Sequence, residues 1–526
     1  MSDNIENSKQ KKGSKAKENL LKSPVILLMA VISGIMSVLS YAFRISYVFI
    51  DSAVFNGLSM TLLWISIINT LLLLSAYVLK AYKITCKGKL LSDTKGFVVT
   101  YFVCFGLTIF FVIYIIVNMI ISGAESIPVA FKLLRENILY VIGVFTIVLL
   151  LAILPNVKNK KVIASISIVV GLGIFFSAIF TIYPDRVYKL TADPMVVDSG
   201  ENFSIIFATS DIGTGYVEYE YEGEKYKVYD EKGGRLKGDS KIHTVKVPKE
   251  HLIDNTYKVG SKRVIDELSY GGRTGKEVVS KGYEFTVPKG DKQSYLTVSD
   301  WHTHLNDAYN AVDNVGEYDG VILLGDAVPG LMFEDEIKDY IVEFGGKLSK
   351  GTKPVIYVRG NHETRGKKAS ELLDYLGMDS FYYTAGYGDY EFVVLDSGED
   401  KEDSHPEYGG MNNYAQYRKD MVDWMKTLEK TDKKTIALVH SHVICLEKEL
   451  EQVAYDELKR LGISQIVGGH IHTTEYMEYN GMKVYLDGGY NNNEYTASKI
   501  TLSKEGYLLE AWNNKDKKVF DKKIAW

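Results

Sequence analysis

The chain has 526 residues, which is too long for one ordinary domain, so we expect several. Its formal net charge of −5 gives no global basic field and excludes a nucleic-acid partner attracted by overall charge. The three cysteines, Cys86, Cys104 and Cys445, are too few and too scattered for a disulfide framework.

The first 23 residues carry six lysines among Ser, Asn and Glu, and we expect a solvated basic tail at 1–23. Five long apolar runs without Asp, Glu, Lys or Arg follow it. The runs are Val25–Phe43, Val54–Leu79, Phe97–Ile121, Ile138–Leu154 and Val162–Tyr183. Buried helices of a soluble protein seldom run this long without a charge, so the pattern predicts an all-α bundle of five transmembrane helices at 24–183.

Lysines are distributed unevenly between the predicted loops. Fourteen lie in the tail and in the loops after the second and fourth runs, whereas the other two short loops hold Arg44, Lys132 and Arg135. The positive-inside rule then puts the N-terminus in the cytoplasm, and an odd number of spans puts everything after Tyr183 outside it. Loss of one span, most easily the short fourth, would reverse this orientation. The expected location is the plasma membrane, with multiple passes.

The pattern changes at about residue 186 to short alternating runs separated by Gly, Asp and Asn. Such runs over roughly one hundred residues predict a β-sandwich at 186–289. His243 and His251 within it are expected at the surface.

From residue 292 to 526, short β-like runs alternate with helix-like stretches, which predicts layered α/β architecture. Helices are expected at 333–348, 370–376, 414–428 and 449–461. Five of the β-like runs end in an acid, an amide or an imidazole, at the sheet edge where α/β proteins build their sites. These residues are Asp300, His302, Asp326, Asn361, His440, His470 and His472. Oxygen and imidazole ligands in this number can hold two divalent metals, and without thiolates a closed structural zinc site is not expected.

The ordered motifs Asp-x-His, Gly-Asp, Gly-Asn-His-Glu, a strand-ending His and Gly-His-x-His resemble those of the calcineurin-like metallophosphoesterases. The resemblance covers 292–526 and implies a four-layer α/β (α+β) domain. A preceding sandwich resembles the layout of purple acid phosphatases, which implies a fibronectin type III-like domain at 186–289. Pro329 stands where purple acid phosphatases have a tyrosine, and they lack a ligand equivalent to His302, so iron is not specifically implied.

The same resemblance implies a role for each residue, with Asp326 bridging two divalent ions such as Mn, Fe or Zn. It gives Asp300, His302 and His472 to one ion, and Asn361, His440 and His470 to the other. His362 is implied to stabilise the transition state or to protonate the leaving oxygen. Two further residues are candidates only: Arg365 either contacts phosphate or is solvated, and His442 is a candidate for the pocket lining. An extended backbone between His470 and His472 would point the two imidazoles apart.

These inferences predict a membrane-anchored, extracytoplasmic phosphoesterase that hydrolyses phosphate mono- or diesters by metal-activated hydroxide. The alternative is a membrane sensor or binding module with a degenerate metal site. A transporter is disfavoured because the apolar runs hold no ionisable residue. The implied partners are a phosphate-ester substrate and the lipid bilayer; no partner protein is indicated, and the sequence does not identify the substrate.

Overall fold

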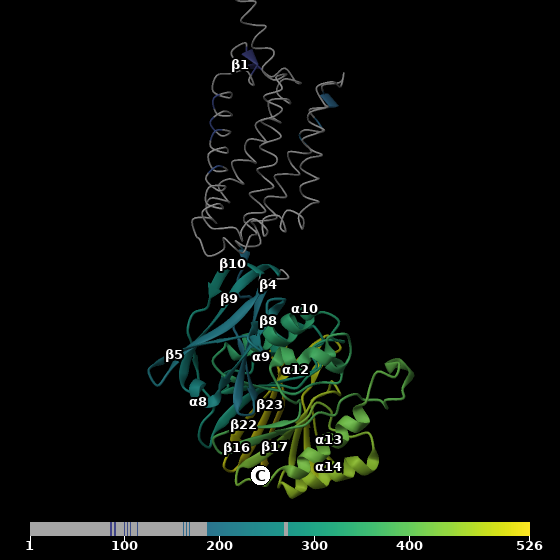
Figure 1. Ribbon diagram of the computed structural model, residues 1–526. Coiled ribbons are helices and arrows are strands. Elements are labelled where there is room, and N and C mark those ends of the chain that lie inside the picture. The colour runs from purple at the N-terminus through teal and green to yellow at the C-terminus, as the bar shows by residue number, and fades with distance from the viewer. Residues whose placement is uncertain are drawn as a thin grey trace, which may run out of the picture. The chain divides into compact units, whose positions relative to one another are not determined.

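The computed structural model describes residues 187–267 and 272–526, together with scattered positions between 85 and 168 (Figure 1). Two compact units divide the chain, one of residues 1–186 and 265–273 and the other of 187–264 and 274–526. Within the first unit, strands β1 (Thr85–Cys86) and β2 (Lys89–Leu90) pair antiparallel. All further elements described here belong to the part of the chain after residue 187.

The predicted fold class needs a correction in its first part, the all-α transmembrane bundle. Across the positions that the structure describes, no helix combines the length and the apolar character needed to cross a membrane. The five apolar runs at 24–183 fall almost wholly outside the described residues. The fold that the structure does support is α/β with mixed sheets.

A 14-stranded mixed sheet forms one half of this part of the molecule. Its central strands are parallel, and antiparallel strands extend it on both sides. From edge to edge the strands are β10 (Gly272–Val279), β9 (Asn255–Glu267), β4 (Asn202–Tyr221), β3 (Met195–Ser199), β14 (Pro354–Tyr357), β13 (Gly320–Leu323), β12 (Gln293–Val298), β22 (Glu494–Ser503), β23 (Gly506–Asn513) and β24 (Lys518–Ala525). Shorter or lateral strands pair with these: β5 (Glu224–Tyr229), β8 (Ser240–Pro248), β11 (Tyr283–Phe285) and β21 (Gly489–Asn491). Strands β6 (Glu231–Lys232) and β7 (Arg235–Leu236) pair only with each other.

A six-stranded sheet packs against it, also with parallel strands in the middle. Its order is β15 (Tyr383–Tyr387), β16 (Tyr390–Val394), β17 (Lys434–Leu438), β18 (Gln465–Gly468), β20 (Met482–Leu486) and β19 (Glu475–Tyr479). Side chains of both sheets, including Tyr295, Ile322, Phe392 and Leu438, share one buried cluster. Strands β13 and β14 are buried along their whole length, and β12 at every residue except Ser294, because other layers cover both faces of the sheet.

Helices cover the outer faces of the two sheets (Figure 1). Helices α9 (Leu305–Asp313), α11 (Glu343–Ser349) and α12 (Leu372–Leu376) pack on the larger sheet, and α13 (Tyr414–Thr427) and α14 (Lys448–Arg460) on the smaller. The remaining short helices and turns are α8 (Lys249–Leu252), α10 (Glu334–Ile337), η5 (Lys338–Val342), η6 (His362–Thr364), η7 (Ala369–Glu371) and η8 (Pro406–Tyr408). The order helix, sheet, sheet, helix agrees with the layered α/β prediction for this region.

The predicted sandwich segment is continuous with the α/β sheet, which is a second correction to the fold class. Strand β3 pairs in parallel with β14, with Val196 opposite Pro354 and Val197 opposite Val355. Residues 187–264 and 274–526 consequently form one compact unit. The exact domain boundaries, at 186–289 and 292–526, stay predictions.

His243 on β8 is fully buried, contrary to the expectation that it lies at the surface. Its Nε2 atom lies 3.1 Å from Thr209 Oγ1 and 3.2 Å from Ser261 Oγ. Ser261 Oγ is also 2.6 Å from the Tyr188 hydroxyl. Alternation cannot reveal this burial, because the hydroxyl partners come from distant strands.

Burial lowers the pKa of His243 to about 3, and this predicts a pH dependence of stability. An unfolded histidine titrates near pH 6.5, so below that pH the unfolded state binds more protons than the folded state. Stability should therefore fall as pH drops from about 6.5 towards 3, with this residue contributing at most about 1.4 kcal/mol per pH unit. The free energy of unfolding, measured with denaturant at pH 7, 6 and 5, should depend less steeply on pH in His243→Gln than in the wild type. Equal slopes would contradict the prediction.

Candidate active site

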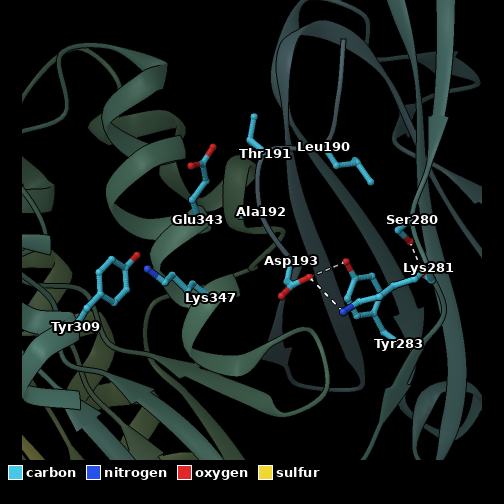
Figure 2. A pocket seen from close by; sticks show the side chains of 10 residues that line it. All are labelled: Leu190, Thr191, Ala192, Asp193, Ser280, Lys281, Tyr283, Tyr309, Glu343 and Lys347. Atoms are coloured by element: carbon cyan, nitrogen blue, oxygen red, sulfur yellow. Dashed lines mark hydrogen bonds and ion pairs between the residues drawn. The ribbon is translucent and has the colours of Figure 1, made fainter. Parts of the chain in front are cut away.

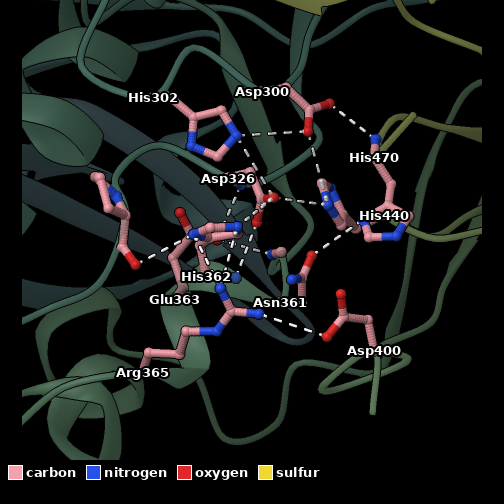
Figure 3. Close-up of polar contacts among 12 residues, drawn as sticks. Asp300, His302, Asp326, Asn361, His362, Glu363, Arg365, Asp400, His440 and His470 are labelled. Atoms are coloured by element: carbon pink, nitrogen blue, oxygen red, sulfur yellow. Dashed lines mark hydrogen bonds and ion pairs between the residues drawn. The ribbon is translucent and has the colours of Figure 1, made fainter. Parts of the chain in front are cut away.

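Five parallel strands from the two sheets deliver the predicted site residues to one place (Figure 3). Strands β12, β13 and β14 belong to the larger sheet, and β17 and β18 to the smaller one. Asp and His side chains beyond their C-terminal ends form three overlapping groups, within each of which the candidate ligand atoms lie no more than 4.8 Å apart. The groups are Asp300, His302 and His472; His302, Asp326 and His362; and Asp326, His440 and His470.

The backbone at this cluster is left-handed at most of the acidic and imidazole positions. The φ angles are +50° at Asp300, +37° at His302, +58° at Asp326, +77° at His470 and +52° at His472. Each such non-glycine residue costs about 1–2 kcal/mol, and residues of this kind concentrate at functional sites. The extended backbone expected between His470 and His472 is therefore wrong. The left-handed turn still sends the two imidazoles to different groups.

One carboxylate oxygen of Asp300 accepts hydrogen bonds, and the other has no hydrogen-bond partner. Its Oδ2 atom accepts hydrogen bonds from the Ser299 hydroxyl and from the His470 N–H, the latter at 2.8 Å. Its Oδ1 atom is buried without a hydrogen-bond partner and lies 3.4 Å from His472 Nε2. A buried carboxylate oxygen without a donor is costly unless a cation meets it.

Backbone carbonyls orient three of the imidazoles. The Nδ1 atom lies 2.6 Å from the Leu324 oxygen in His440, 2.6 Å from the Tyr490 oxygen in His472, and 3.1 Å from the Pro329 oxygen in His362. A carbonyl only accepts, so each Nδ1 carries a proton and each Nε2 atom is the one that faces the carboxylates. This is the tautomer that a metal-ligating histidine needs, and His440 Nε2 is buried without a partner.

The charges of the Asp and His side chains in the cluster favour a bound cation. Burial alone would lower the pKa of His440, but the carboxylates of Asp326 and Asp300 raise it to about 10. Burial would likewise raise the pKa of Asp326, yet the neighbouring His440 and His362 hold it below its usual range. At His302 burial prevails and lowers the pKa to about 4, which favours the neutral imidazole that metals bind. This donor set fits divalent cations.

Asn361 and His362 complete the arrangement from the loop after β14. The Asn361 Oδ1 atom lies 3.1 Å from His470 Nδ1. The His362 N–H donates to Asp326 Oδ1 at 2.9 Å, and its Nε2 lies 3.8 Å from Asp326 Oδ2. All seven predicted ligands and His362 thus lie together.

Sequence reasoning assigned no role to Glu363, which the structure places beneath this cluster. Its fully buried carboxylate accepts hydrogen bonds from the N–H groups of Asp326, Ala327 and Gly360, at 2.9, 2.5 and 2.9 Å. The sequence does hold a signal for this residue: it is the acid that ends the motif Gly-Asn-His-Glu, in the loop directly after a predicted strand. Glu363 ties together the two loops that carry Asp326 and Asn361.

Glycines in the Gly-Asp and Gly-Asn motifs allow the loops that carry Asp326 and Asn361 to contact each other. A Cβ atom on Gly325, whose φ is +86°, would lie 2.3 Å from the nitrogen of Gly360. A Cβ on Gly360 would lie 2.2 Å from Asp326 Oδ1. The Gly-Asp and Gly-Asn loops can therefore touch only without side chains at both positions.

The two tentative residues have different environments. The Arg365 Nη1 atom lies 3.2 Å from His362 Nε2, and its Nε and Nη2 atoms each lie 2.8 Å from a Glu399 oxygen. It is therefore an ion-paired residue beside the site and not simply solvated. The ring of His442 packs edge-on against Tyr479, with 4.9 Å between ring centroids, and its backbone oxygen accepts from Tyr455.

A pocket of about 730 Å³ lies elsewhere, between the strand region around Asp193 and helix α11 (Figure 2). Two charged residues of its lining contact other residues of the same lining. Asp193 accepts a hydrogen bond from the Tyr283 hydroxyl at 3.0 Å, and the Lys347 Nζ atom lies 3.4 Å from the ring centre of Tyr309. None of the predicted site residues lines it. Its size alone does not make it the reaction site.

Comparison with known proteins finds a family model that matches part of the chain. The family model of the calcineurin-like phosphoesterases matches residues 294–474. A comparison with curated proteins finds no match. Among solved structures, that of PhoD is 9% identical, with a TM-score of 0.40, and the match covers 64% of this chain and 90% of that one.

Two further solved structures show lower scores. GAP50, the anchor in the inner membrane complex of Plasmodium, is 12% identical with a TM-score of 0.33, covering 45% of this chain and 89% of that one. Phosphopantetheinyl hydrolase from Mycobacterium tuberculosis is 15% identical with a TM-score of 0.26, covering 38% and 89%. Identities and scores at this level say nothing about the substrate of this chain. With the family match and the clustered Asp and His groups together, residues 294–474 form a calcineurin-like phosphoesterase domain, and the chain is a hydrolase acting on phosphoric ester bonds.

Proposed function

We propose that the domain hydrolyses phosphate mono- or diesters with two divalent metal ions. The observation that carries this proposal is the overlap of the three Asp and His groups, in which Asp326 belongs to two. Asp300, His302 and His472 would hold one ion, and Asn361, His440 and His470 the other, with Asp326 shared. When bound, the ions would supply Lewis-acid activation of water and of the phosphoryl oxygens.

The protein residues would then orient the substrate and donate a proton to the leaving oxygen. The Nδ1–H of His362 donates to Pro329, so the Nε2 atom is the one that faces the cluster. Protonated at Nε2, His362 would donate that proton to the leaving oxygen. Arg365 contacts the His362 ring and would direct an N–H group towards the same region.

Metal-dependent hydrolysis is the direct test. The full chain, stripped of metal and reloaded separately with Mn, Fe, Zn or Co, should hydrolyse nitrophenyl phosphate or bis-nitrophenyl phosphate. The stripped protein should be inactive and should recover on reloading. Absence of activity with all four metals would refute the proposal and favour the sensor or binding-module alternative.

His362→Ala should lower kcat while both metals remain bound. An acid contributes most when the leaving group is a poor one, so the loss should be about 10²-fold or more for an alkyl phosphate ester and smaller for a nitrophenyl ester. Metal analysis and kcat for the two ester types check this. Equal losses for both leaving groups would exclude the acid role.

Membrane anchoring and a site outside the cytoplasm rest on the sequence alone, through the apolar runs and the lysine distribution. We propose this location for the enzyme, together with a layout similar to that of purple acid phosphatases only in that a β-rich segment precedes the catalytic domain. Protease added to intact cells should then release a catalytic fragment beginning near residue 185. Protection until the membrane is permeabilised would refute the location.

A further inference from the structure

The charge of Arg365 is more than balanced by two carboxylates. Glu399 binds its Nε and Nη2 atoms in a bidentate pair, each contact being 2.8 Å long. Asp400 Oδ1 lies 3.5 Å from the same Nη2 atom, and a dashed line marks this contact in Figure 3. One guanidinium therefore faces two acids, and the side of the site beyond His362 carries a net negative charge.

The two acids differ in their surroundings. Burial would raise the pKa of Glu399, but its hydrogen bonds with Arg365 hold the pKa below its ordinary value. The Asp400 side chain is 35% exposed and lies on the solvent side of Arg365 Nη2. Two carboxylates and one guanidinium thus line this side of the cluster.

The loop that carries these acids is fixed from behind by two buried arginines. Arg359 pairs with Asp396, with nitrogen–oxygen distances of 2.7 and 2.8 Å. Arg418 Nη1 donates to the Ser397 carbonyl at 3.2 Å. Because Arg359 is buried, the loop cannot swing Glu399 away from Arg365 without breaking the Arg359–Asp396 ion pair. Arg418, whose charge is paired with Glu447, would lose its hydrogen bond to the Ser397 carbonyl.

Neighbouring lysines do not offset this charge, because acids engage them. Lys368 Nζ lies 2.7 Å from Glu371, and Lys401 Nζ lies 2.6 Å from Glu407. A phosphate monoester carries close to two negative charges above about pH 6, whereas a diester carries one. Repulsion by the wall at Glu399 and Asp400 acts on the monoester about twice as strongly.

We propose that this site selects phosphodiesters over phosphomonoesters, and that Asp400 is a specificity-determining residue through its charge. The inference rests on the proposed function and adds the substrate class to it. Arg365 then serves mainly to orient a singly charged phosphoryl group and the His362 ring, since Glu399 neutralises its charge.

Asp400→Asn in the full metal-loaded chain tests the proposal. The wild type should show a higher kcat/KM for bis-nitrophenyl phosphate than for nitrophenyl phosphate, which share one leaving group. The variant should lower this ratio by roughly threefold to tenfold, chiefly by raising kcat/KM for the monoester. Inorganic phosphate should also inhibit the variant more strongly than the wild type, and added salt should shrink both differences.

Glu402→Gln is the matched control, since it removes one exposed acid from the same loop and should leave the ratio unchanged. Three results would overturn the inference: a wild type that prefers the monoester, a ratio unchanged in Asp400→Asn, or an equal shift in Glu402→Gln. Each of these leaves metal-dependent hydrolysis intact. Failure of the proposed function would instead abolish hydrolysis of both esters in the wild type.

Discussion

Asp326→Asn is expected to lower kcat for phosphate-ester hydrolysis by about 10³-fold or more, the upper end of what removal of one preorganised electrostatic group costs. Asp326 Oδ2 lies 3.2 Å from His440 Nε2 and 3.8 Å from His302 Nε2, so this carboxylate reaches both halves of the cluster. The amide keeps the shape but removes the charge that would offset repulsion between the two proposed cations. Metal analysis and kcat, measured on the same preparation, check this.

The fold should survive this substitution, so the loss can be assigned to the site. The Asn361 loop still has its hydrogen bond, because the amide oxygen can accept from the His362 N–H as Asp326 Oδ1 does at 2.9 Å. Asp423→Asn on the exposed face of α13 is the matched control and should keep full activity. If Asp326→Asn retains both its metal and its rate, Asp326 does not bridge two ions.

The strand ends of the site could be predicted from the sequence because their signal is local. Each buried run is short, β-like and directly followed by a polar ligand, and the observed strands β12, β13, β14, β17 and β18 match the predicted ones. Parallel strands bring their C-terminal ends to one edge, so convergence followed from the α/β pattern. The four predicted helices also correspond to helical segments of the structure.

Other features depend on contacts between distant segments, which a single sequence does not reveal. Helix α9 was not predicted, although Ala308, Ala311 and Val312 form its buried face, because a helix of nine residues offers only a short apolar pattern. The left-handed backbone at His470 lies where strand ends from two sheets meet. The pairing of Arg365 with Glu399 joins residues 34 positions apart.

The sandwich segment illustrates how the same local pattern fits more than one architecture. Alternating strands at 195–285 predict β-structure correctly, but alternation does not say which strand lies beside which. The parallel pairing of β3 with β14 extends the central sheet across the predicted boundary. The all-helical bundle was likewise inferred from hydropathy alone, and the described helices do not support it.

Glu363→Ala is expected to destabilise the site more than any substitution outside the cluster. The change removes the acceptor for three backbone N–H groups, of Asp326, Ala327 and Gly360, and leaves them buried. An unsatisfied buried donor costs about 1–3 kcal/mol, so the free energy of unfolding should fall by roughly 3 kcal/mol or more. Because these N–H groups set the positions of two ligand loops, metal affinity should fall about 10–100-fold as well.

Denaturant unfolding of the metal-free protein and metal titration of the folded protein separate the two effects. Glu363→Gln keeps one acceptor oxygen but directs an amide N–H group at backbone donors, so its losses should fall between those of the wild type and Glu363→Ala. Glu371→Ala removes a nearby acid that is paired only with Lys368 at the surface, and it should change neither quantity by a comparable amount. Wild-type stability and metal affinity in Glu363→Ala would show that the Gly325 and Gly360 loops hold their positions by direct packing alone.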